Sequence, residues 1–230
     1  MKNVFLIVLG TYALTPAMAA EVPLCALPQD NNEIRVDAEI DPGCAPMIAD
    51  AKKVAAAVKS NTLFTNKAPL PAQLSIGAVY LQPITMSPEG MMRSREQSDI
   101  HLELDIHAKE NLKTRGFAPG DWLPNVDGEY TIQKIGSTAP LKCTTHMGNT
   151  ASSTACKLMP MVASDGAHYG DNVKLDGPGF YIVTFTARTN PHFGWHTDTE
   201  SKILGTEYVN WHFTQSYLFK WTGIGKKGGY

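Results

Sequence analysis

Strict alternation of apolar and polar residues over 99–107 is the feature that most constrains the fold of this chain. Ile100, Leu102, Leu104 and Ile106 alternate with acidic and histidine residues. Successive side chains of a β-strand point to opposite faces, whereas those of a helix repeat every 3.6 residues. The stretch therefore predicts a β-strand with one apolar face for a core and one polar face.

Further β-prone runs follow from residue 74 onward, separated by turn signals and not by helix-length spacers. These runs cover 76–81, 130–132, 158–162, 179–187 and 209–221. Six or seven strands connected in this way predict an all-β fold, an antiparallel β-sandwich.

The segment before the strands predicts export and a short extension. Residues 1–19 combine an early lysine, a short apolar run and Ala17-Met18-Ala19, which predicts a cleavable signal peptide too short to span a bilayer. Residues 20–70 form an N-terminal extension, in which Pro46 and the apolar spacing after it predict one helix near 46–59. The main domain is expected at 71–225.

Export changes the interpretation of the four cysteines, because an oxidising compartment favours disulfides over metal ligands. Pairing of sequence neighbours is preferred, Cys25 with Cys44 and Cys143 with Cys156. The alternative pairs one cysteine of each segment, which would attach the N-terminal arm to the later loop. Both connectivities stay open at this point.

The polar face of the 99–107 strand is rich in metal-binding groups. It carries Asp99, His101, Glu103, Asp105 and His107. Carboxylates are depleted in strands and repel one another when adjacent, so a bound cation would offset the cost of this face. The alternative is a solvated face of an edge strand.

Two further segments supply candidate ligands. Met159 and Met161 share one strand face, and a loop after them presents His168. Thioether selects Cu(I), imidazole suits Cu(II) and zinc as well, and the harder carboxylate of Glu103 suits iron or manganese. His196 projects from a glycine- and aromatic-rich loop. Taken singly, the methionines are better explained as core filler, and His196 as a surface histidine.

Other functions are disfavoured by what the sequence lacks. The formal net charge is −2 and no basic tract is present, so no nucleic-acid partner is expected. No nucleophile elbow, HExxH motif, phosphate loop or dinucleotide fingerprint occurs, which favours a binding protein over an enzyme.

Three segments in order resemble one known family, the bacterial periplasmic iron-transport accessory proteins, some of which are pathogen membrane antigens. The segments are 78–86, 99–108 and 158–170, and the similarity runs from about 76 to 223. The resemblance implies an immunoglobulin-like sandwich that forms a periplasmic homodimer with a copper site near the dimer interface. It assigns the ligands to His101, Met161, His168 and His196, with Glu103 nearby or alternative and His196 expected from the other subunit.

The resulting hypothesis is a metal-binding accessory protein of a high-affinity iron uptake system that works with an inner-membrane iron permease. Copper is the expected cofactor, with iron as cargo and iron or manganese at a second or shared site. Two alternatives remain: a periplasmic copper-buffering protein without an iron role, and a copper-dependent Fe(II) oxidoreductase.

Overall fold

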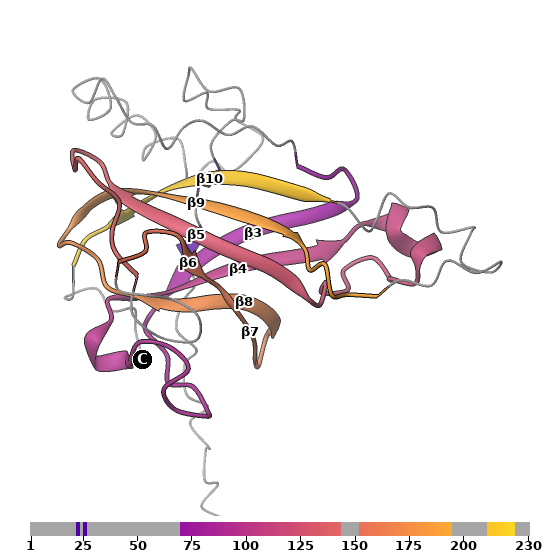
Figure 1. Cartoon of the computed structure of the whole chain (residues 1–230), viewed down its shortest axis with the longest axis horizontal. Helices are drawn as coiled ribbons and strands as arrows, with labels where there is room; N and C mark the ends of the chain where they lie inside the picture. The colour runs from indigo at the N-terminus through magenta and orange to yellow at the C-terminus, as the bar shows by residue number, and fades with distance from the viewer. Residues whose placement is uncertain (1–21, 24, 27–69, 144–151, 195–210, 224–230) are drawn as a thin grey trace, which may run out of the picture.

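The computed structural model describes residues 22–23, 25–26, 70–143, 152–194 and 211–223. Within these residues two antiparallel five-stranded sheets lie face to face (Figure 1). The predicted all-β antiparallel sandwich is confirmed. The immunoglobulin-like connectivity and the boundaries at 71 and 225 stay predictions, and the expected signal peptide and the helix near 46–59 lie outside the described residues.

The first sheet has the strand order β1-β3-β4-β8-β7. Its strands are β1 (Val22–Pro23), β3 (Leu74–Leu81), β4 (Ile100–Ala108), β8 (Gly166–Val173) and β7 (Met159–Ala163). The second sheet has the order β2-β10-β9-β5-β6. Its strands are β2 (Cys25–Ala26), β10 (His212–Trp221), β9 (Gly179–Thr189), β5 (Val126–Lys134) and β6 (Cys156–Lys157).

Helical structure in the described part is limited to two short 3-10 segments, η2 (Arg95–Gln97) and η3 (Glu110–Arg115). Neither segment, nor any other helix of the described residues, has the length and apolarity needed to cross a membrane.

The core fills the space between the sheets and follows from the alternation seen in the sequence. Leu102, Leu104 and Ile106 of β4 are fully buried and belong to one cluster with aromatic residues such as Phe185 and Phe219 of the second sheet. Burying each such side chain contributes roughly 1.5–3 kcal/mol. The apolar face of β4 therefore points inward, and its polar face is left on the outer side of the first sheet.

Strand β8 corrects one expectation. The segment presenting His168 was expected to be a loop, yet it pairs with β4 on one side and β7 on the other. Two glycines and several polar residues within 166–173 gave it a weak β-pattern. Pairing on both edges outweighs that low propensity, because a central strand satisfies all of its backbone groups.

The N-terminal extension also contributes more than expected. Val22 and Pro23 pair with β3, while Cys25 and Ala26 pair with β10. The chain thus adds a short edge strand to each sheet in turn. Such two-residue runs are too short to give a periodic signal in the sequence.

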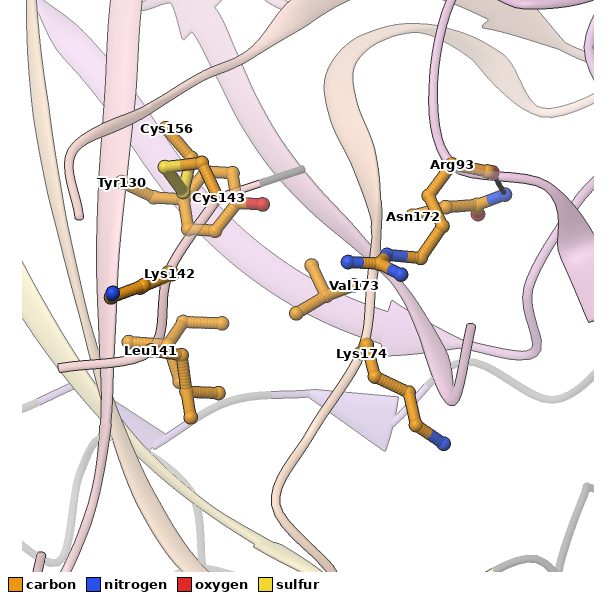
Figure 2. Close-up of a pocket in the computed structure, with 10 residues that line it drawn as sticks. Arg93, Tyr130, Leu141, Lys142, Cys143, Cys156, Asn172, Val173 and Lys174 are labelled. Atoms are coloured by element: carbon orange, nitrogen blue, oxygen red, sulfur yellow. Dashed lines mark hydrogen bonds between the residues drawn. A yellow bond between two sulfur atoms is a disulfide. The ribbon is translucent and has the colours of Figure 1, made fainter. Parts of the chain in front are cut away.

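A disulfide joins Cys143 to Cys156, with Cα atoms 5.4 Å apart. Figure 2 shows it on one side of a small pocket, beside Tyr130 of β5. The sequence-neighbour pairing is confirmed for this pair. The expected partner of Cys25, Cys44, lies outside the described residues.

Candidate metal centre

Strand register gathers the candidate ligands on the outer face of the first sheet. His101 pairs with Asn172, Glu103 with Gly170, and Gly170 in turn with Met159. His168 of β8 pairs with Met161 of β7. Because paired residues of neighbouring strands share a face, imidazole, carboxylate and thioether groups from three strands lie together.

Three of these side chains converge on one point. Nε2 of His101 lies 3.5 Å from Oε1 of Glu103, and Nε2 of His168 lies 3.2 Å from the same oxygen. The two rings are 5.9 Å apart between centroids and nearly perpendicular. His101 is 0% exposed, His168 4% and Glu103 5%, so the three groups meet away from bulk water.

Asn172 fixes the tautomer of His101. Its Nδ2 donates to the carbonyl oxygens of Ile84 (2.8 Å) and Arg93 (2.9 Å), so its Oδ1 must face the histidine. That oxygen lies 3.0 Å from Nδ1 of His101, and an amide oxygen only accepts. Nδ1 therefore carries the proton, and Nε2 presents a lone pair toward Glu103. Figure 2 shows the Asn172–Arg93 bond at the edge of the small pocket.

His168 is arranged in the same way. The backbone of Gly166 accepts a hydrogen bond from it, while its Nε2 is buried and has no hydrogen-bond partner. The bonded nitrogen is therefore Nδ1, and Nε2 is again the free one.

The burial of these rings sets their charge. Desolvation lowers the pKa of His101 to about 3, against the smaller raising effect of its bond to Asn172. Desolvation also lowers the pKa of His168, although Asp105 and Asp165 act in the opposite direction. A lowered pKa keeps imidazole neutral at pH 7, which is the form that binds metals.

A bound cation would stabilise this geometry. Two buried Nε2 lone pairs point at one carboxylate oxygen, and neither nitrogen has a hydrogen-bond donor against it. Unpartnered buried polar atoms cost about 1–3 kcal/mol each. Within the described residues, His101, Glu103 and His168 form the cluster of histidine and acidic ligands close enough to share one ion. The residues present therefore fit a metal ion.

Gly170 leaves the space that the His101 ring occupies. A β-carbon built on Gly170 would lie 2.8 Å from Nε2 of His101 and 3.0 Å from the carbonyl oxygen of Leu102. The first contact is shorter than a β-carbon tolerates and the second is tight, so a larger residue would force the ring or β8 to shift, and glycine lets β8 run this close to the ring.

The remaining residues of the predicted polar face have other roles. Asp99 accepts hydrogen bonds from Lys174 and from the backbone N–H of Leu175. His107 contacts the carbonyl oxygen of Gly120 through Nδ1. Asp105 faces a cleft of about 250 Å³ beside the centre, and desolvation raises its pKa.

Of the predicted ligands, Met161 lies in register beside His168 and is 8% exposed, while His196 lies outside the described residues. Asn172 and Gly170 are the two residues that the sequence did not single out. Gly170 and Asn172 follow His168 at steps of two residues in β8 and so share its face of the sheet. A sequence prediction that assigned 166–173 as a strand would have indicated both.

Together the fold and the site define a β-sandwich protein with a buried histidine–carboxylate centre suited to a metal ion. The chain belongs to the Fe2+ transport protein family, whose sequence model matches residues 65–223.

Relatives of known sequence agree with this membership. A UPF0423 protein of Brucella abortus is 44% identical over 162 residues, which cover 68% of this chain and 80% of the relative. The 34 kDa membrane antigen of Treponema pallidum is 34% identical over 154 residues, covering 65% of this chain and 69% of that protein.

Solved structures give the same fold. A copper-bound glutamate-to-glutamine variant of FetP from uropathogenic Escherichia coli is 34% identical and superposes with a TM-score of 0.53, covering 71% of this chain and 94% of that one. A copper-bound glutamate-to-glutamine variant of the P19 protein of Campylobacter jejuni is also 34% identical, with a TM-score of 0.55 and coverage of 69% and 95%.

Proposed function

We propose that this chain is a periplasmic copper-binding accessory protein of a high-affinity iron uptake system. The observation that carries the proposal is the pair of buried Nε2 lone pairs of His101 and His168 aimed at Glu103. Copper-bound structures of two similar proteins, FetP and P19, favour copper as the ion. Expression of FetP in a periplasm and the signal-like sequence at 1–19 support the location.

The proposed ligand set is His101, Met161, His168 and His196, with Glu103 as a nearby or alternative ligand. Nitrogen and thioether ligands together accept both Cu(I) and Cu(II), so copper bound here would be held in either oxidation state. His196 is proposed to come from the second subunit of an immunoglobulin-like homodimer. Asn172 and Gly170 hold the His101 ring in place, which is the role of groups behind the ligands in metal sites generally.

Iron is the proposed cargo, and an inner-membrane iron permease is the proposed partner. The family description, an Fe2+ transport protein, supports iron. Carboxylates prefer harder ions such as iron and manganese. Glu103 also borders the cleft that holds Asp105 and Asp165, which places hard ligands beside the soft ones.

The proposal is tested by deleting the gene and measuring iron uptake in chelated medium, then complementing with variants. We expect uptake to fall and to return with the wild-type gene but not with His101→Ala/His168→Ala. His212→Ala, at an exposed residue of β10 in the second sheet, is the matched control and should restore uptake. Unchanged uptake in the deletion strain would overturn the iron role.

The ligand chemistry has its own test in purified protein. Met161→Ala should weaken Cu(I) far more than Cu(II), because the thioether is the soft ligand. Glu103→Gln should weaken Fe(II) and Mn(II) more than copper. Equal losses for all ions would mean that neither side chain selects among metals.

A second candidate is a copper-buffering protein without an iron role. The observation that favours it is the cluster of methionines beside the histidines, because thioethers are soft ligands that select Cu(I) over harder ions. A deletion strain that is copper-sensitive and takes up iron normally would support this function instead.

A further inference from the structure

The methionines of the described residues form one cluster on the outer face of the first sheet. Met92, Met159 and Met161 are buried, and Met86 and Met91 pack against them with Ile84. Met159 and Met161 come from β7, whereas the other three come from the loop between β3 and β4. Figure 1 shows this loop, in magenta, beyond β8 and β7 on the side away from β9 and β10.

The composition of this cluster differs from that of the main core. All five described methionines lie in it, and the large cluster between the sheets contains none. Methionine used as a gap-filler would be expected in the main core as well, where most of the apolar volume is. The confinement of the described methionines to this cluster indicates that thioether sulfur is required on the outer face of the first sheet.

The cluster reaches from solvent to the metal centre. Met86, Met91 and Met92 line an open cavity of about 300 Å³. Met92 belongs to one buried cluster with the two methionines of β7. Met161 in turn pairs with His168, and Met159 pairs with Gly170 beside Glu103. Thioethers therefore follow one another from the cavity to the His101–Glu103–His168 cluster.

The charge of the cavity favours a soft ion over a hard one. Two glutamates and two arginines line it, Glu89, Glu96, Arg93 and Arg95, so their formal charges cancel. A hard divalent cation gains little from such a lining. A monovalent soft cation is attracted by the sulfurs instead.

The loop is attached to the same residue that orients His101. Asn172 receives the N–H of Ile84 and donates to the carbonyls of Ile84 and Arg93. Its remaining contact is to Nδ1 of His101. The methionine-bearing loop and the ring of a proposed ligand thus share one anchoring side chain.

We infer that Met86, Met91 and Met92, with Met159 of β7, form a second metal site, selective for Cu(I), from which Cu(I) passes by way of Met161 into the histidine–glutamate centre. The inference goes beyond the proposed function, because none of these four methionines is a ligand of the proposed centre and the iron role does not require them.

The test counts ions in the purified full-length protein. Cu(I) is titrated under reducing, anaerobic conditions against a colorimetric Cu(I) chelator, and Cu(II) is counted by electron paramagnetic resonance. Wild-type protein should bind two Cu(I) and one Cu(II). Met86→Leu/Met91→Leu/Met92→Leu, which conserves side-chain volume, should bind one Cu(I) and one Cu(II).

Ile84→Leu, in the same cavity, is the matched control and should keep two Cu(I). Stopped-flow measurement of the loading rate tests the entry role separately from the number of sites. The triple variant should fill the centre with Cu(I) at least tenfold more slowly than the wild type, and its rate of Cu(II) loading should not change. One Cu(I) per wild-type chain, or two in the triple variant, would overturn the site. Equal loading rates would overturn the entry role. If the wild-type protein bound no Cu(II), the copper centre of the proposed function would be contradicted instead.

Discussion

Replacement of Gly170 by alanine is expected to damage the metal centre without touching a ligand. The new β-carbon would stand 2.8 Å from Nε2 of His101, against about 3.4 Å for an ordinary contact, so the ring must move by about 0.6 Å. The ring is fully buried and its Nδ1 is held 3.0 Å from Asn172, which leaves it little room. The carbonyl oxygen of Leu102, 3.0 Å from the new β-carbon, belongs to the backbone of β4 and cannot move as a side chain would.

Two magnitudes follow from this clash. Overpacking of a closed site costs about 1–3 kcal/mol of unfolding free energy. Displacement of a supported ligand lowers metal affinity by about 10- to 100-fold. Urea unfolding of the metal-free protein measures the first quantity, and Cu(II) competition with a chelator measures the second.

Gly77→Ala is the matched control for this experiment. Gly77 also lies in a strand of the same sheet, and a β-carbon there would have no neighbour within 4 Å. The free energy of unfolding should rise by about 0.4–1 kcal/mol, because alanine restricts the unfolded chain, and copper affinity should not change. If Gly170→Ala bound Cu(II) as tightly as Gly77→Ala, the close approach of β8 to His101 would not position the ligand.

Three further outcomes are expected. His101 takes up a proton near pH 6.5 in the unfolded chain but only near pH 3 in the folded metal-free protein. The free energy of unfolding should therefore fall by up to about 1.4 kcal/mol per pH unit as the pH drops from 6.5 toward 3. Urea unfolding of His101→Gln should show a shallower slope, and identical slopes would contradict the neutral buried ring. Asn172→Ala should lower Cu(II) affinity about 10- to 100-fold, since it frees the tautomer of His101, and competition titrations giving wild-type affinity would contradict that role. Cys143→Ser/Cys156→Ser opens a link between residues 13 apart and should lower the free energy of unfolding by about 3 kcal/mol in urea; no change would show that the bridge does not constrain the unfolded chain.

The strand that carries His101 and Glu103 was predictable because its pattern is local. Each apolar residue of β4 has its partner two positions away, and the period of two survives whatever the strand packs against. The soft and hard ligand types could be read from the sequence in the same way, since ligand preference belongs to the side chain.

The convergence of the ligands was decided only by the tertiary structure. His168 acquires its place because β8 inserts between β4 and β7, and nothing local in 166–173 specifies that pairing. Asn172 acts on His101 from 71 positions away and holds a loop 88 positions away, and such distances leave no periodic trace. Sequence by itself determined the kinds of atoms available and the strand that bears two of them. Long-range pairing determined which atoms meet, because register between distant strands is set by packing of the whole sheet and not by any one segment.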